Sequence, residues 1–324
     1  MPTRIPLTLA CGSYDINQAL IDGTVSPDGI DLTVLTYPSP ERHWRMLRHE
    51  EFDACELSMA SFLMLHDRGR GLKAIPAFPH RRFRHGFIYV NAAAGIDRPA
   101  DLEGRRVGLR TWQTTAGLWA RGILQDHYGV DLSTIEWVCQ DEEDIPFDPP
   151  PQYRLRRVAE GGTVTAMLER GELDALIYPE TPVPIHRGDP RVRTLFDDPK
   201  AEEIAWFGAT GFFPIMHTVV IRHSVAEANP WVPRNLLLAF RASKDLAFRR
   251  AIDPRRISLA WVSQLIAEQR RILGEDPWCY EFEPNRRLLA QMIRWSHEQG
   301  MIGREFEPEE MFFAATRDEL PTYV

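Results

Sequence analysis

The chain has 324 residues, of which 46 are acidic and 38 basic, so its formal net charge is −8. This excess of acids argues against nucleic acid as a partner, because binding to phosphates requires a basic surface. The composition, 44% hydrophobic and 26% charged, is that of a globular protein. The length suffices for two domains of ~100–200 residues. No run approaches the ~18 apolar residues of a membrane span, so no membrane partner is expected.

The amino-terminal segment lacks the pattern of an export signal. Such a signal needs an apolar core of ~7–15 residues, whereas the run 5–10 is interrupted by Pro6 and Thr8. We therefore expect a cytoplasmic protein. Its four cysteines are far apart without a C-x-x-C pair, which favours small buried residues over zinc ligands, with a nucleophilic thiol as the open alternative. They are Cys11, Cys55, Cys139 and Cys279.

Strand and helix patterns alternate through the first 90 residues. Apolar or β-branched runs predict strands at the start of 5–15 and at 30–38, 52–58, 71–78 and 86–90. The segments 16–23, 41–52 and 59–69 between them predict helices. Strands that alternate with helices indicate an α/β fold with a largely parallel sheet.

The middle of the chain repeats this alternation. Strands are predicted at 105–109, 135–140, 172–180 and 217–222, and helices at 116–129 and 163–171. The segment DEEDIPFDPPPQY (141–153) predicts a loop, because acids and prolines follow one another without a period. The remainder is mostly helical, at 231–252, 257–273 and 285–300.

The strands at 87–90 and 218–222 bracket the middle block, so the chain is expected to pass twice between two lobes. We predict a discontinuous lobe 1 of residues 1–88 plus 219–324, with the C-terminal helices, and a lobe 2 of residues 89–218. Two crossings between α/β lobes produce a cleft, and ligands of open α/β sheets lie beyond the carboxyl ends of the strands.

Several segments form a combined pattern: YDINQALIDG (14–23), EFDACELSMASF (51–62), AIPAFPHRRFRHGFIYVN (74–91), GIDRPADLEGRRVGLR (95–110), TWQTTAGLWARGIL (111–124) and FFPIMHTVVI (212–221). Together they resemble the 4,5-dihydroxyphthalate decarboxylase family, which is built like the solute-binding proteins of ABC transporters. The resemblance covers most of the chain, and RRFRH and FPIMHT are its most selective parts. It implies a two-lobed, periplasmic-binding-protein-like (type II) fold with a central cleft. It also implies a carboxy-lyase for a phthalate-type acid, an activity of aromatic compound degradation. The loop 141–153 departs from the plainer loop expected in relatives, which bears on the precise substrate.

Loss of CO2 from an electron-rich ring needs no redox partner and no electron-sink cofactor, provided that the ring carbon can be protonated. The protein must hold the anion, supply a proton and keep the leaving carboxylate weakly hydrated. A divalent metal is the less favoured alternative, because no close pair such as H-x-H accompanies the ligand types His85, His217, Glu56 and Glu180.

The stretch RRFRH offers guanidinium groups, which match the geometry of a carboxylate bidentately. In an extended run Arg82 and Arg84 share one face, whereas Arg81, Phe83 and His85 share the other. Arg82 and Arg84 are therefore the first candidates to anchor the substrate, and Arg81 is the third. The alternative is a surface turn of solvated arginines.

Two histidines are candidates for the proton donor, because imidazole titrates near neutral pH. His85 is the first choice. His217 in FPIMHT precedes the second crossing strand, so both rings could face one cleft. Glu56, at the end of the strand 52–58, could orient a histidine or bind a ring hydroxyl. Its alternative role is a cap or a salt bridge.

Thr114 and Thr115 stand at the start of the helix 116–129, where exposed N–H groups make an anion seat. Either hydroxyl could instead be the helix N-cap. Further candidates to line the site lie where strands end: Ser13, Tyr14, Asp15, Arg110, Tyr178 and Glu180. Trp295, Phe312 and Phe313 could mediate assembly into a homo-oligomer.

Three classes of function remain: a cytoplasmic aromatic-acid decarboxylase, a solute-binding protein for a small anion without catalysis, and a ligand-sensing or scaffold protein. The lack of an export pattern and the histidines favour the first, since anion binding alone needs only arginines and amides. The expected partner is then a small aromatic carboxylate.

Overall fold

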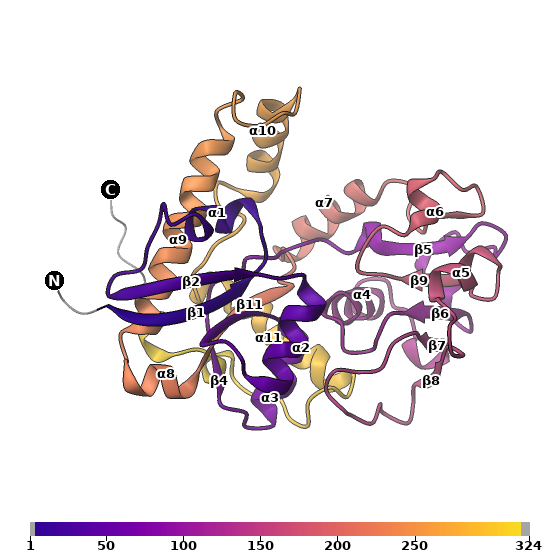
Figure 1. The fold of residues 1–324 in the computed structure, drawn as a ribbon. Coiled ribbons are helices and arrows are strands. Elements are labelled where there is room, and N and C mark those ends of the chain that lie inside the picture. The colour runs from indigo at the N-terminus through magenta and orange to yellow at the C-terminus, as the bar shows by residue number, and fades with distance from the viewer. Residues whose placement is uncertain (1–3, 319–324) are drawn as a thin grey trace. The chain divides into compact units, whose positions relative to one another are not determined.

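The structure, a computed structural model, describes residues 4–318 and divides into two compact units, each with its own sheet (Figure 1). Unit 1 contains the described residues up to Arg81, Ile215–Ala290 and those from Phe306 on. Unit 2 contains Arg82–Pro214 and Gln291–Glu305. These bounds differ from the predicted lobes by several residues at each crossing. They also place part of the C-terminal helical region in unit 2.

Unit 1 is built on a five-stranded sheet in the order β2-β1-β3-β11-β4. Strands β1, β2 and β3 are parallel, whereas β11 is antiparallel to both β3 and β4. All five residues of β3 are buried, so this strand lies in the core. The strands are β1 (Ile5–Cys11), β2 (Ile30–Thr36), β3 (Ala54–Ser58), β4 (Leu72–Ile75) and β11 (His217–Arg222).

The helices of unit 1 differ in how far they are buried. Helix α3 (Met59–Asp67) is apolar on almost all sides, and its residues 59–65 are buried. Helix α10 (Val262–Leu273) buries only Val262 and stands out from the unit with the end of α9 (Figure 1). The others are α1 (Gln18–Ile21), α2 (Ser39–His49), α8 (His223–Ala228), α9 (Val232–Ala251) and α11 (Arg286–Glu298), which continues into unit 2.

The exposed apolar side chains are not those expected. Trp295 and Phe312 are buried and Phe313 is half-buried, so the prediction that this group forms an exposed surface for self-association is wrong. The large exposed apolar side chains of this unit include Leu259, Trp261 and Leu265, at the start of the protruding α10.

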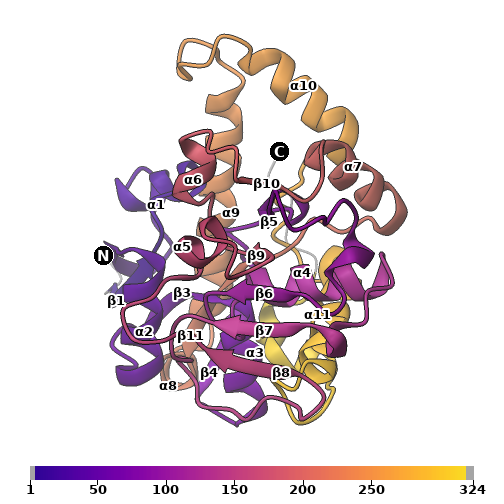
Figure 2. The same cartoon turned by 90° about the vertical axis from the view of Figure 1, so that its right-hand side faces the viewer.

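Unit 2 has a six-stranded sheet in the order β10-β5-β9-β6-β7-β8, which faces the viewer in Figure 2. Strands β9, β6, β7 and β8 are parallel, and β5 is antiparallel to its neighbours β9 and β10. The strands are β5 (Ile88–Asn91), β6 (Arg106–Leu109), β7 (Glu136–Cys139), β8 (Arg154–Arg157), β9 (Ala175–Ile177) and β10 (Val192–Thr194).

Helices cover both faces of this sheet. Helix α5 (Val164–Glu169) packs its buried side chains against Tyr89, Val138 and Leu176 of the strands. Helix α4 (Thr115–Asp126) lies on the opposite face (Figures 1 and 2). The remaining helices are α6 (Val183–His186) and α7 (Pro199–Thr210).

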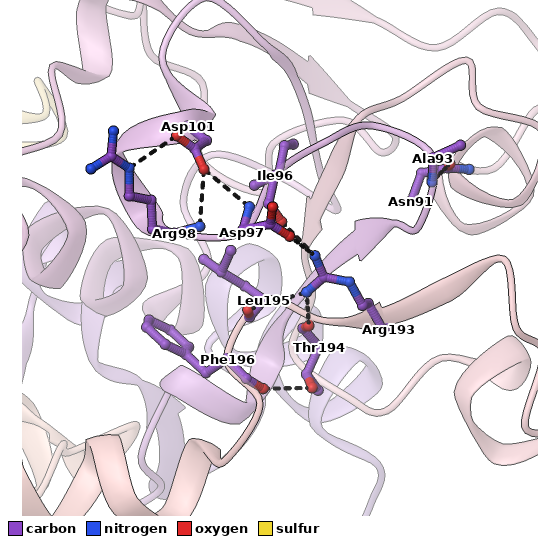
Figure 3. A network of polar contacts seen from close by, with 10 residues as sticks. All are labelled: Asn91, Ala93, Ile96, Asp97, Arg98, Asp101, Arg193, Thr194, Leu195 and Phe196. Carbon is purple, nitrogen blue, oxygen red and sulfur yellow. Dashed lines mark hydrogen bonds and ion pairs between the residues drawn. The ribbon is translucent and has the colours of Figure 1, made fainter.

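The edge strand β10 is tied to the segment that follows β5 by a polar network (Figure 3). Arg193 donates to the carbonyl oxygen of Ile96 (2.7 Å) and to the carboxylate of Asp97 (2.8 Å). Asp101 then accepts from the backbone N–H groups of Asp97 and Arg98. These bonds satisfy backbone groups that an edge strand and a loop would otherwise leave to water.

The predicted α/β class is confirmed, with two differences within the elements. The strand expected at 86–90 begins with a 3-10 helix, His85–Phe87, and β5 starts at Ile88. The sequence analysis did not predict α6, α7, α8 or the short strands β8 and β10. The segment 141–153 is a loop, as predicted. Among residues 4–318, no helix combines the length and the hydropathy needed to cross a membrane.

Candidate active site

The register of the sheet in unit 1 brings Glu56 and His217 together. Strand β11 is antiparallel to β3, and Val219 lies directly opposite Glu56. Opposed residues point to the same face of a sheet, and so does the residue two positions along. Since His217 is two residues before Val219, its ring lies beside the Glu56 carboxylate. Its Nδ1 is 2.5 Å from Glu56 Oε1.

Glu56 is fully buried and its carboxylate is surrounded by hydrogen-bond donors. Besides His217, Oε1 forms an ion pair with Arg42 Nη2 (3.0 Å) and accepts from the Tyr14 hydroxyl (2.9 Å). Oε2 accepts from the backbone N–H of Gly12 (2.7 Å), just beyond β1. The carboxylate is thus held at the carboxyl ends of β1 and β3, where ligands of α/β sheets bind.

These donors keep Glu56 ionised. Burial by itself would raise the pKa of this carboxyl group, but the charge of Arg42 and the bond from His217 outweigh it and hold the pKa well below its usual range. An ionised carboxylate in turn stabilises the protonated form of the adjacent imidazole. The pair can therefore hold a proton on His217.

Besides pairing with the Glu56 carboxylate, Arg42 donates hydrogen bonds to backbone carbonyl oxygens near it. Its Nε donates to the Glu56 carbonyl oxygen (3.0 Å) and its Nη1 to the Tyr37 carbonyl oxygen (2.7 Å). The sequence analysis predicted the helix 41–52 but did not select Arg42 as a site residue. In the structure Trp44 is exposed, and the buried face of α2 contains Arg42, His43, Met46 and Leu47.

Two further histidines pack on His217, and neither was predicted. The rings of His43 and His80 meet the His217 ring edge-on, with centroids 5.0 and 4.7 Å away. His43 Nε2 is buried without a hydrogen-bond partner among the described residues. Burial, assisted by the neighbouring His217 and Arg42, holds the pKa of His43 well below its usual range, so its imidazole is neutral. His80 directly precedes the RRFRH stretch, which was the available signal.

His85 belongs to unit 2 and lies in an aromatic environment. Its ring contacts Tyr128, Phe196 and Trp206 at centroid distances of 5.5–6.0 Å. Both ring nitrogens are buried without a hydrogen-bond partner in the described structure. Burial lowers the pKa of His85 to about 4. A neutral ring buried among aromatic side chains is poorly suited to the proton-donor role expected for it.

The three arginines of the RRFRH stretch have different surroundings. In unit 1, Arg81 is buried and donates to Asn285 Oδ1 (2.6 Å) and to the Cys279 carbonyl oxygen (3.2 Å), a structural arrangement. In unit 2, Arg82 is exposed and Arg84 is buried. Arg82 and Arg84 therefore do not share one environment, whereas the expected extended run would have placed them on the same face.

Arg84 is a buried cation that interacts electrostatically with Glu203 but donates its hydrogen bonds to carbonyl oxygens. It donates to the carbonyl oxygens of Arg82 (3.3 Å) and Pro179 (3.5 Å), and its guanidinium lies 4.5 Å from the centroid of the Phe87 ring. Burial, and to a lesser degree the charge of Arg82, lowers its pKa to about 9.

The other predicted residues of unit 2 lie near the start of α4 or at the end of β9. Thr114 is the N-cap of α4 and accepts from the Gly117 N–H (3.1 Å), and Thr115, the first residue of the helix, is buried. Arg110 forms an ion pair with Asp141 (2.8 Å). Tyr178 is half-buried and Glu180 is exposed.

The remaining candidates lie in unit 1, apart from one cysteine. Ser13 and Asp15 are exposed, and Asp15 caps the following turn through the Ile16 N–H (2.9 Å). Three of the four cysteines are buried, as expected, and burial raises the pKa of Cys11 and of Cys139 in unit 2 to about 12. Within residues 4–318, no three His, Cys, Asp or Glu side chains are placed to share a metal ion.

Solved structures identify the fold. The periplasmic aliphatic sulphonate binding protein SsuA of Escherichia coli matches with a TM-score of 0.58 at 14% identity, over 97% of this chain and 98% of that protein. The alkanesulfonate-binding protein SsuA of Xanthomonas axonopodis pv. citri, bound to MOPS, matches with a TM-score of 0.53 at 12% identity, over 98% of each chain. The fold is that of the periplasmic solute-binding proteins, as predicted.

Sequence relatives identify the family. A 4,5-dihydroxyphthalate decarboxylase of Comamonas testosteroni is 36% identical over 323 residues, 97% of this chain and 98% of that protein. Another, of Pseudomonas putida, is 34% identical over 216 residues, 64% of this chain and 84% of that protein. A family model described as NMT1/THI5 like matches residues 26–146. The chain belongs to the 4,5-dihydroxyphthalate decarboxylase family, a family of carboxy-lyases, which confirms the predicted resemblance.

Proposed function

We propose that this protein decarboxylates a hydroxylated, phthalate-type aromatic acid and that His217 donates the proton to the ring. Family membership supports the class of reaction. The observation that carries the assignment of the donor is the contact between His217 Nδ1 and the ionised, fully buried Glu56.

The reaction needs one proton and no electrons from outside. The imidazolium gives its proton to the ring carbon that bears the carboxylate, so a C–H bond forms and the hydroxyl group para to it donates electron density into the ring. The bond to the carboxylate then breaks, its electron pair restores the aromatic ring, and CO2 leaves. The neutral imidazole recovers a proton from water, and the net change is the replacement of a carboxylate by hydrogen.

Glu56 orients the imidazole in this scheme. Because its carboxylate holds Nδ1, the ring nitrogen that exchanges a proton with a substrate is Nε2, as in other carboxylate–histidine pairs. Arg42, Tyr14 and Gly12 fix the carboxylate itself, so the ring direction is set before substrate binds. His43, which stays neutral, is available to hydrogen-bond a ring hydroxyl through Nε2.

We assign the anchoring of a substrate carboxylate first to Arg84. A buried guanidinium whose hydrogen bonds go only to carbonyl oxygens gains strongly from a carboxylate, because charge-assisted hydrogen bonds then use its remaining donors. Arg82 is the second candidate.

The test is the release of CO2 from 4,5-dihydroxyphthalate by the purified protein. In D2O the product should carry one deuterium, on the carbon that lost the carboxylate. His217→Gln should lower kcat by about 10²–10⁴-fold, the usual contribution of a positioned acid, with a much smaller change in KM. His223→Gln, an exposed histidine at the start of α8, is the control. Full activity of His217→Gln would refute the donor assignment.

Ligand binding without chemistry is the second candidate function, because the structural neighbours are solute-binding proteins. Tight binding of one hydroxylated phthalate with no release of CO2 from any of a panel would establish this alternative and refute the decarboxylase.

A further inference from the structure

The acidic loop 141–145 of unit 2 is fastened to the segment that leads into α4. Glu143 accepts from the backbone N–H groups of Trp112 (2.7 Å) and Gln113 (3.1 Å), one on each carboxylate oxygen. Asp141 pairs with Arg110 (2.8 Å). The backbone N–H of Ile145 donates to the side-chain oxygen of Gln113 (3.1 Å).

These donors are the kind that an anionic ligand uses. Consecutive backbone N–H groups in the turn before a helix can form a concave site that binds carboxylates. Here two of them already hold a carboxylate, and it comes from the chain itself. Arg110, which the sequence marked as a residue for substrate binding, is likewise engaged by an acid of the same loop.

A second observation places a buried cation with an unused hydrogen-bond donor at this end of α4. Arg121 is fully buried, its Nη1 has no hydrogen-bond partner among the described residues, and its guanidinium stacks 3.8 Å from the centroid of the Trp112 ring. A Cβ on Gly117 would lie 2.8 Å from both Arg121 Nη1 and Thr114 Oγ1. The guanidinium therefore reaches back to the first turn of the helix.

From these contacts we infer that Glu143 is an internal competitor, which occupies a carboxylate subsite at the amino end of α4 and must leave when an aromatic dicarboxylate binds there. This inference deepens the proposed function and depends on it for the class of ligand. It makes the loop 141–145 a determinant of substrate affinity, because each binding event includes the release of the Glu143 side chain.

The energetics favour an exchange of one carboxylate for another. Burial raises the pKa of Glu143, although the N–H groups of Trp112 and Gln113 and the charges of Arg121 and Arg157 partly oppose this shift, so the charged form is not strongly stabilised where it lies. A ligand carboxylate can use the N–H groups and also hydrogen-bond Arg121 Nη1, whereas Glu143 interacts with Arg121 only through its charge. The side chain of Glu143→Gln, the neutral isostere of the native one, should compete with a ligand carboxylate less well than the native side chain.

The experiment measures the affinity of unreactive phthalate by calorimetry for the native protein, Glu143→Gln and Glu142→Gln. Glu142 is the exposed neighbour, so this control makes the same change in net charge next to the subsite. Glu143→Gln should bind phthalate at least about fivefold more tightly, the lower end of a typical coupling between competing groups, and Glu142→Gln should bind it like the native protein. Unchanged or weaker binding by Glu143→Gln, or no binding by either protein, would overturn the inference.

Hydrogen exchange of the native protein supplies a readout that needs no variant. Phthalate should speed the exchange of backbone amides in 141–145, among them the Ile145 N–H, because the loop loses its contacts. Slower or unchanged exchange there would count against release of Glu143. Tighter phthalate binding by Glu143→Gln without CO2 release from any hydroxylated phthalate would refute the proposed function and leave this inference in place.

Discussion

Replacing Glu56 by Gln tests whether the buried carboxylate organises the candidate active site. The shape of the side chain is kept, but its charge is lost and only one oxygen remains to accept hydrogen bonds. In the native protein Oε1 contacts the His217 ring, the Arg42 guanidinium and the Tyr14 hydroxyl, and Oε2 accepts from the Gly12 N–H. Either orientation of the amide therefore sets an N–H group against at least one donor.

The larger cost comes from Arg42. Its side chain is 1% exposed, and Glu56 is its counter-ion. Breaking a buried ion pair by removing one partner typically costs about 3–5 kcal/mol, because the remaining charge stays buried and unbalanced. We expect Glu56→Gln to lower the stability of the protein by this amount. A second substitution, Arg42→Met, made in the Glu56→Gln background, should recover at least about 1 kcal/mol of it.

The assay is urea unfolding at pH 7 followed by circular dichroism, with the shift in midpoint measured at constant slope. Glu180→Gln, an exposed carboxylate, is the control. The difference from the native protein should shrink at low pH. The pKa of Glu56 is lower in the folded than in the unfolded protein, so its stabilisation is present above the unfolded pKa of ~4.3 and is lost as the pH falls through the folded pKa. A midpoint equal to that of Glu180→Gln, or no recovery in the double variant, would refute the reasoning.

Two further predictions concern unit 2. His85→Phe should retain activity, because Phe fits the aromatic surroundings of a ring that we do not assign to proton transfer. The folded pKa of His85 is about 4. As the pH falls from ~6.5 to ~4, the free energy of unfolding of the native protein should therefore fall by up to about 3 kcal/mol, and that of His85→Phe should not show this loss. Loss of turnover in His85→Phe, or a loss of stability at acid pH equal to that of the native protein, would contradict this prediction. Arg84→Lys should raise the Kd for phthalate about tenfold, because an ammonium cannot replace the bidentate fork. An unchanged Kd in calorimetry would exclude Arg84 as the anchor.

Many strands and helices could be predicted from the sequence because the residue patterns that indicate them extend over only a few positions. Alternating apolar residues indicated β1, β3 and β11, and a helical period indicated α9 and α11, since each pattern depends on neighbours within a few positions. Family segments were recognisable for the same reason. Glu56 and His217 could be selected singly because each stands at the end of a predicted strand.

What the sequence could not show was which distant residues meet. Glu56 and His217 are 161 positions apart, and only the register of β11 against β3 sets their carboxylate and ring side by side. Arg42 and His43 were not selected from the sequence, and packing buries them on the inner face of α2. His85 looked like a catalytic histidine until burial among aromatic rings left it neutral. Charge, chemical type and period are properties of single residues and short runs. Burial and pairing depend on how the whole chain packs, and in this protein they keep Glu56 ionised and His43 and His85 neutral.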